Sequence, residues 1–145
     1  MKATDTGGNP MGRSKIREHI FKLLFMSQFN TEEEMPQQLT IYFNELEELD
    51  ESDRAYMQEK YEQVISHLKE IDELLNQLSK GWKTSRMARV DLTALRLSVY
   101  ELKYEEEIPT KVSINEAVEL AKRFGGEDSF AFVNGILGRV AKELR

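Results

Sequence analysis

Apolar residues recur at helical spacing along almost the whole chain beyond residue 11. Steps of three and four separate them, and strict alternation of apolar and polar residues, which predicts strands, extends nowhere beyond a few positions. Residues 1–11 show no such period and contain Gly7, Gly8 and Pro10, so they predict a flexible tail. The pattern therefore predicts a single all-α domain over residues 12–145.

Two helices are predicted before residue 50. The first runs from Ser14, a suitable N-cap, to Gln28. Phe25 lies away from the apolar stripe of this helix on a helical wheel, which predicts an exposed ring. Thr31 and Glu34 have the spacing of a capping box and predict the start of a second, short helix. The apolar stripes consist of Ile16, Ile20, Leu23 and Leu24 in the first helix, and of Leu39, Tyr42, Phe43 and Leu46 in the second.

The longest uninterrupted helical pattern covers residues 52–79, which contain neither proline nor glycine. Its apolar residues alternate steps of four and three, as in a heptad repeat, but the repeat covers only about three heptads. A bundle helix broken near Lys69 is therefore favoured over a free coiled coil, and one helix or two both remain open. Gly81 suits the C′ position that ends this segment. The repeat consists of Met57, Tyr61, Val64, Leu68, Ile71, Leu75 and Leu78.

Two further helices are predicted between residues 86 and 124. Residues 86–104 carry two apolar stripes on opposite sides, so this helix is predicted to be the central element of the fold. Ser113 and Glu116 have the spacing of a second capping box and predict a helix that continues to Phe124. The small residues Ala117 and Ala121 are predicted on its inner side.

The last helix is predicted to start near Asp128 or Ser129, after the glycine pair at residues 125–126. Phe132 lies about 100° from the middle of its apolar stripe, so this ring is predicted off the core. A second face of small residues predicts close packing against a neighbouring helix. That face consists of Ala131, Gly135 and Gly138.

Composition excludes several classes of protein. The 145 residues, 40% of them hydrophobic, suffice for one folded domain, and the absence of cysteine excludes disulfide scaffolds, cysteine nucleophiles and thiolate metal sites. His19 and His67 are too far apart in the sequence for a short metal-binding motif, and no pair of carboxylates lies in an apolar setting near a histidine or a nucleophile. We therefore expect no metal, cofactor or catalytic centre. No apolar run approaches the roughly 20 residues of a membrane span, and no secretory signal is recognisable. A soluble protein of the reducing cytoplasm is predicted.

The net charge of −6 conceals an uneven distribution. Residues 1–30 carry five Lys/Arg against two Asp/Glu, residues 31–78 carry three against fourteen, and residues 79–145 carry twelve against ten. Basic side chains from the two ends of an acidic chain are therefore available to form one RNA-binding surface. The same numbers equally fit a solvated acidic helix face with no ligand.

Three segments in the second half form a distinctive set: VDLTALRLSVYEL (residues 90–102), IPTKVSINEAVELAKRFG (residues 108–125) and FVNGILGRVA (residues 132–141). Together they resemble the NusB family of bacterial transcription antitermination factors. The opening GRSKIREHIFKLLFMSQF and the turn at residues 82–86 are similar to that family as well, whereas residues 31–80 match only in pattern. The likeness spans residues 12–144.

The resemblance implies an all-helical fold of two perpendicular three-helix subdomains with a connecting helix, and no catalysis. It implies that the chain pairs with NusE, a ribosomal small-subunit protein, and that the heterodimer binds the boxA element of nascent RNA. Other Nus factors on RNA polymerase then join, and the elongating enzyme passes terminators, chiefly in ribosomal RNA operons. Some members form homodimers, so a homodimer is a further state that the resemblance implies.

Candidate RNA-binding residues lie at both ends of the chain. Cations at the first helix neutralise phosphates, an off-core aromatic ring stacks on a base, and a hydroxyl or carboxylate accepts from base amino groups. Each has an ordinary alternative: solubilising charge, packing between subdomains, or capping of the last helix. The residues that match the family's RNA surface, together with one lysine that extends it, are Arg13, Lys15, Arg17, Lys122, Asp128, Ser129 and Phe132.

Two residues match the family's NusE contact. Phe25 is an aromatic residue off the core stripe, which is typical of an interface hot spot. Asp91 lies at the start of a predicted helix, where it either pairs with a basic partner or compensates the helix dipole.

Two other functions fit the same sequence. The acidic middle and the heptad repeat suit a helical protein–protein interaction module that binds no RNA. NusB-like domains also precede RNA cytosine methyltransferases, and the chain would then be the RNA-binding portion of such an enzyme.

Overall fold

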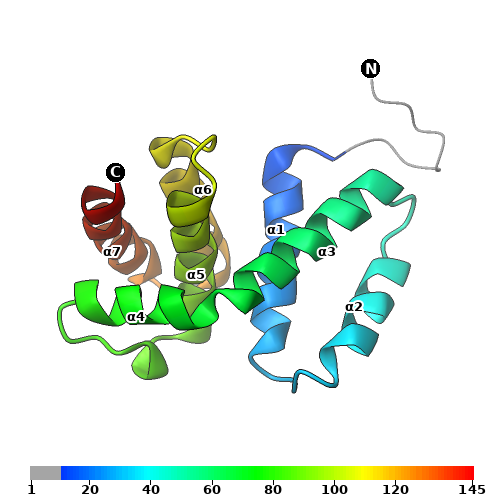
Figure 1. Ribbon diagram of the computed structural model, residues 1–145, viewed down its shortest axis with the longest axis horizontal. Helices are drawn as coiled ribbons and strands as arrows, with labels where there is room; N and C mark the ends of the chain where they lie inside the picture. Colours follow the sequence, from blue (N-terminus) through cyan, green and yellow to red (C-terminus); the bar gives the residue numbers. More distant parts are fainter. Residues whose placement is uncertain (1–10) are drawn as a thin grey trace. The chain divides into compact units, whose positions relative to one another are not determined.

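The computed structural model describes residues 11–145, and this range is helical apart from its connections (Figure 1). No strand occurs among these residues, so the predicted all-α class is confirmed. Residues 1–10, most of the predicted tail, lie outside the described residues. The elements are α1 (Arg13–Ser27), α2 (Met35–Asn44), α3 (Glu51–Ser66), α4 (Leu68–Leu78), the 3₁₀ turn η1 (Thr84–Arg86), α5 (Arg89–Tyr104), α6 (Thr110–Phe124) and α7 (Ser129–Leu144).

The chain divides within α3 into two compact units, one that ends at Gln63 and one that begins at Val64. In the first unit α1, α2 and most of α3 enclose a small core, to which the three helices contribute buried apolar residues. Arg54 of α3 places its guanidinium over the Phe43 ring of α2, 5.1 Å from the ring centre. This core consists of Ile20, Phe21, Leu23, Leu24, Met35, Leu39, Phe43, Met57 and Tyr61.

The start of α1 differs from the prediction. Gly12, not Ser14, is the N-cap of α1, and no side chain caps this helix. The two hydrogen bonds of the first capping box form, but α2 begins at Met35, with Glu34 rather than Thr31 as its N-cap. Thr31 Oγ1 accepts from the N–H of Glu34 at 3.2 Å, and Glu34 Oε1 accepts from the N–H of Thr31 at 2.7 Å. Because Pro36 follows, this box closes a turn immediately before α2.

The heptad segment forms two helices. The break lies at His67, whose backbone (φ −110°, ψ 11°) is not helical. The end of α4 is one residue earlier than predicted. Ser79 is the C-cap, and both Lys80 (φ 53°) and Gly81 (φ 92°) take positive φ angles, so Lys80 rather than Gly81 occupies C′. The long apolar pattern is confirmed, since five of its seven residues are buried: Met57, Tyr61, Val64, Ile71 and Leu75.

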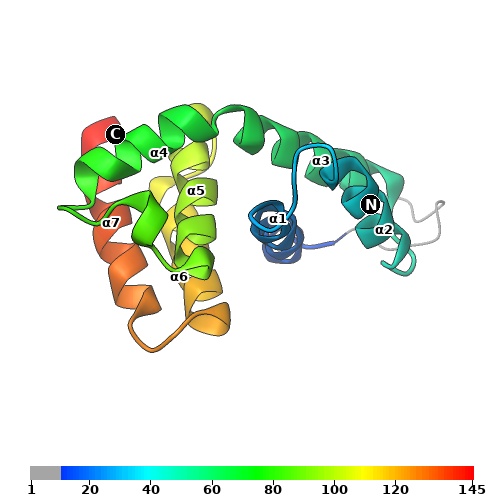
Figure 2. The ribbon, with the colours of Figure 1, turned by 90° about the horizontal axis from the view of Figure 1, so that it is seen from below.

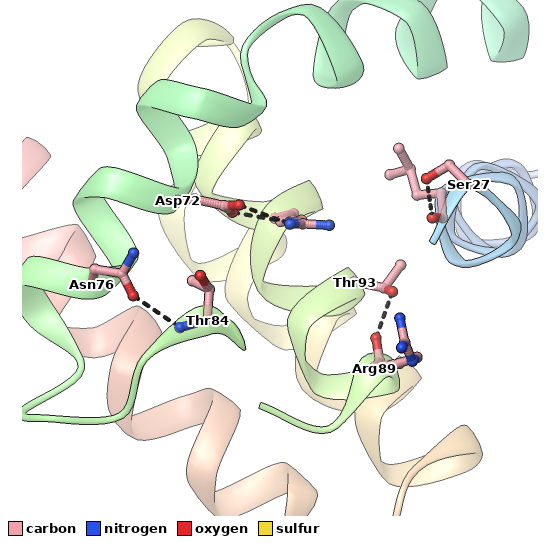
Figure 3. Close-up of polar contacts among 8 residues, drawn as sticks. Ser27, Asp72, Asn76, Thr84, Arg89 and Thr93 are labelled. Atoms are coloured by element: carbon pink, nitrogen blue, oxygen red, sulfur yellow. Dashed lines mark hydrogen bonds and ion pairs between the residues drawn. The ribbon is translucent and has the colours of Figure 1, made fainter. Parts of the chain in front are cut away.

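In the second unit α5 is the central helix, as predicted. It is buried on most of its surface and packs against α4, α6 and α7, with α4 lying across α5 and α7 (Figures 1 and 2). It begins at Arg89 rather than Arg86, because Met87 has an extended backbone (φ −74°, ψ 146°) that separates η1 from α5. Asp72 of α4 accepts two hydrogen bonds from the Arg96 guanidinium of α5, at 2.9 and 2.7 Å (Figure 3).

The predicted capping box of α6 is wrong. Pro109 is the N-cap, so Ser113 lies inside the helix and is buried. Its hydroxyl donates to Glu101 Oε1 at 2.8 Å and lies 2.8 Å from the Ser98 hydroxyl. Ser113 therefore satisfies a buried carboxylate of α5 instead of a helix terminus.

The two predictions of small-residue packing have opposite outcomes. Ala117 and Ala121 are buried on the inner side of α6, as predicted. The face of α7 with Gly135 and Gly138 is exposed, and a Cβ added at either glycine would meet nothing within 4 Å. The prediction of a close neighbour there is wrong for the described residues.

Candidate nucleic-acid interface

The basic residues of α1 are not equally available. Arg13 is the first helical residue, is exposed, and forms no ion pair among residues 11–145. Lys15 is exposed as well, but Glu18 lies 3.5 Å from its ammonium group and 3.0 Å from that of Lys22. Glu18 is buried, and its carboxylate lies close to both ammonium groups. It therefore neutralises part of the positive charge on this face of α1. Arg13 is therefore the exposed cation of α1 whose charge no carboxylate of residues 11–145 neutralises.

Arg17 differs from both. Only 9% of its surface is exposed, and the residue already has an interaction partner. A phosphate contact by Arg17 stays a prediction, and this burial does not favour it.

A partly buried pair of titratable groups lies next to these cations. The Nδ1 atom of His19 and the hydroxyl of Tyr42 are 2.6 Å apart. Burial, with Lys15 and Lys22 nearby, lowers the pKa of His19 below 6.5, while burial, with Glu18 nearby, raises the pKa of Tyr42 to about 12. Both groups are therefore neutral at pH 7, and we assign the proton so that Tyr42 donates to Nδ1.

In the second unit, the turn between α6 and α7 holds two of the predicted RNA residues in different environments. Ser129 is buried, and its hydroxyl accepts from the N–H of Gly126 at 3.0 Å, so Ser129 stabilises the turn. A Cβ at Gly125 would lie 2.4 Å from Ser129 Oγ, which explains the glycine there. Asp128 is exposed at the N-cap of α7 and makes no side-chain capping bond, so its carboxylate faces solvent.

Phe132 lies off the buried stripe of α7, as predicted, and is half-buried. Its ring contacts the ring of Trp82, with centroids 5.8 Å apart and planes at 82°. Trp82 is 56% exposed. Sequence reasoning did not assign Trp82 to the site; the only signal was its position between Lys80 and Lys83 in a short glycine-containing connection.

Lys122 is exposed on α6 and forms no ion pair among residues 11–145. The next residue, Arg123, places its guanidinium 4.9 Å from the ring centre of Phe124. The second unit therefore presents three features that RNA can contact. They are the exposed Lys122 at the end of α6, the exposed Asp128 at the start of α7, and the ring pair of Trp82 and Phe132.

The two predicted partner residues also lie in different surroundings. Phe25 is half-buried between Phe21 (6.5 Å between ring centroids) and Phe29 (5.1 Å), and Phe29, which sequence reasoning missed, is 57% exposed. Asp91 lies in the first turn of α5, is only 7% exposed, and its Oδ1 has no hydrogen-bond partner in the described part of the chain. Phe29 thus presents the accessible end of an aromatic row, whereas Asp91 offers little surface.

Residues 11–145 contain neither a metal-binding cluster nor a membrane-spanning helix. No group of three or more His, Cys, Asp or Glu side chains there is arranged to hold a metal ion. No helix there is long and apolar enough to cross a membrane.

A family model described as the NusB family matches residues 14–142. The chain belongs to the NusB family. A relative from Agathobacter rectalis, called Transcription antitermination protein NusB, is 51% identical over 131 residues, which cover 90% of this chain and 100% of the relative.

Solved NusB structures share the fold. NusB from T. maritima superposes with a TM-score of 0.78 at 34% identity, over 93% of this chain and 94% of that chain. A chain from a crystal structure of the antitermination factors NusB and NusE with double-stranded RNA superposes with a TM-score of 0.76, over 90% of this chain and 96% of that chain. Its identity is 22%, so this likeness supports the fold alone.

Proposed function

We propose that this NusB-family chain is a transcription antitermination factor. It binds boxA RNA together with NusE and supports read-through of terminators, chiefly in ribosomal RNA operons. The observation that carries the proposal is the match, over the whole length of the relative, to a protein called Transcription antitermination protein NusB. The chain acts by binding and has no catalytic role in this proposal.

Three exposed residues and one half-buried ring supply the contacts that single-stranded RNA needs. Arg13 and Lys122 neutralise phosphates, the ring of Phe132 stacks on a base, and the Asp128 carboxylate accepts from base amino groups. The cations of α1 and the aromatic ring of α7 each contact RNA in this proposal. Lys15 contributes less, because Glu18 already neutralises part of its charge.

So small a set of phosphate-binding cations implies weak binding by the chain alone. We propose that NusE docks on the aromatic row that ends at Phe29 and adds the missing affinity, and that other Nus factors on RNA polymerase complete the assembly. We also propose a homodimer as a further state of the free chain.

A titration of fluorescein-labelled boxA RNA tests the proposal. Fluorescence anisotropy is measured at about 100 mM salt, with this chain alone, with NusE alone and with both proteins. We expect weak binding by the chain, markedly tighter binding by the pair, and a preference over a scrambled RNA of the same length. Absence of binding in every mixture, or a stable homo-oligomer that neither RNA nor NusE perturbs, contradicts the proposal and favours a protein–protein module.

A further inference from the structure

We infer that residues 80–86, named here the Trp82 loop, form a second RNA-contact element in which the Trp82 ring stacks on an unpaired base. The base on Trp82 neighbours the base held by Phe132. This inference rests on the proposed function and adds to it a stacking site that the sequence did not reveal.

The geometry of the ring pair supports two stacking sites. Trp82 and Phe132 contact each other, yet more than half of the Trp82 surface is exposed. Because their planes are nearly perpendicular, a base stacked on one ring does not lie parallel to a base stacked on the other. The pair therefore suits two consecutive bases that are splayed apart, as in single-stranded RNA bound by proteins.

The Trp82 loop is held in place by hydrogen bonds at both ends. The Ser79 hydroxyl donates to the carbonyl of Trp82, and the N–H of Thr84 donates to Asn76 Oδ1 at 2.8 Å (Figure 3). Arg139 of α7 donates from Nε to the carbonyl of Leu78 at 2.6 Å, which ties the end of α4 to α7. A preordered loop loses little conformational entropy on binding, so the exposed ring contributes most of its stacking energy.

Charge around the ring identifies a polyanion as the ligand. Residues 80–89 contain four cations and no acidic residue, in a chain whose net charge is −6. The side chains of Lys80, Lys83 and Arg86 are exposed and form no ion pair among residues 11–145. Alternating cations and an exposed aromatic ring are the features with which proteins follow a single strand, phosphates on the cations and bases on the ring. A protein partner would leave most of these cations without counter-charge unless it were strongly acidic.

Trp82 is the only tryptophan, so its intrinsic fluorescence reports on the proposed stacking directly. Unlabelled boxA RNA is titrated into the chain while a parallel titration follows the anisotropy of labelled RNA. Stacking predicts that emission falls with the same midpoint as the anisotropy rises. A rise in anisotropy with unchanged emission overturns this inference and leaves the proposed function intact. No rise in anisotropy, with or without NusE, overturns both.

Substitution of the ring separates stacking from an indirect change in its surroundings. Trp82→Ala is expected to weaken RNA binding about fivefold or more, and Trp82→Phe, which keeps an aromatic face, to weaken it much less. Circular dichroism checks that both variants remain helical. Equal RNA affinity of Trp82→Ala and the unmodified chain overturns the inference, as does a loss of NusE binding with RNA binding unchanged.

The cations of the loop have their own test. Lys80→Gln combined with Lys83→Gln is expected to reduce the slope of log affinity against log salt by about 1.4, or about 0.7 for each phosphate that is no longer neutralised. The matched control combines Lys111→Gln with Lys142→Gln, two exposed lysines of the second unit outside the loop. An equal reduction in both double variants shows a general charge effect and overturns the role of the loop.

Discussion

At the scale of single residues, His19 and Tyr42 link the stability of the first unit to pH. The pKa of His19 is lowered in the fold, so the unfolded chain binds more protons below pH 6.5 and stability falls as the solution is acidified. The pKa of Tyr42 is raised from 10.0 to about 12, so the folded chain holds its proton longer and stability falls as pH rises from 10 towards 12. The contribution of these two groups to the stability of the first unit is therefore largest between about pH 6.5 and pH 10, where both are neutral.

His19→Asn tests this linkage, because an amide oxygen replaces Nδ1 as acceptor and does not titrate. We expect urea unfolding between pH 5 and pH 8 to show a smaller loss of stability on acidification for the variant than for the unmodified chain. Identical pH dependence of the two proteins would show that His19 is not responsible.

The turn before α7 depends on one glycine and not on its neighbour. Gly125→Ala would bring a Cβ to 2.4 Å from Ser129 Oγ and 2.6 Å from the carbonyl oxygen of Ala121, so we expect a loss of about 1–3 kcal/mol of stability. Gly126→Ala is the matched control, since a Cβ there meets nothing within 4 Å. Thermal unfolding measures both, and equal effects would contradict the steric explanation.

At the scale of helices and their connections, the glycines of α7 and of the Trp82 loop should respond in opposite directions. Gly138→Ala adds a methyl group in open space inside a helix and is expected to stabilise the protein by about 1 kcal/mol. Gly81→Ala forces a side chain to φ 92° and is expected to destabilise it by about 1–2 kcal/mol. Urea unfolding gives both values. Destabilisation by Gly138→Ala would show that the exposed face of α7 is covered after all.

Helix positions were predictable where local signals were sufficient. The apolar period predicted the helices, and the Thr31–Glu34 capping box forms as its spacing indicates. The same spacing at Ser113 was misleading, because the buried carboxylate of Glu101, on another helix, accepts the Ser113 hydroxyl. Whether residues 52–79 form one helix or two also depended on packing, since no proline or glycine marks the break at His67.

The candidate site was predictable only in part, for a similar reason. A helical wheel placed Phe132 off the core because that position depends on α7 alone. Burial of Arg17 and Ser129, and contact between Trp82 and Phe132, depend on residues far apart in the sequence, which a local pattern does not contain.

At the scale of the whole molecule, the two arginines of α1 are expected to have different roles. The exposed Arg13 contributes to RNA binding, and the buried Arg17 contributes to stability. Arg13→Gln is expected to lower RNA affinity and to reduce the salt slope by about 0.7, with stability unchanged. Arg17→Gln is expected to cost about 1 kcal/mol or more of stability, because it replaces a buried residue that already has an interaction partner. RNA titrations at several salt concentrations and urea unfolding measure the two effects. An unaltered slope for Arg13→Gln would remove α1 from the RNA contact.

The Glu18 carboxylate between Lys15 and Lys22 has a consequence for selectivity in the cell. Any nucleic acid that approaches this helix competes with an internal anion that is already in place, on a molecule whose overall charge repels polyanions. Cellular RNA of arbitrary sequence is therefore expected to bind this protein only weakly. We expect the chain to stay free of nonspecific RNA and to bind tightly only when boxA RNA and NusE are both present.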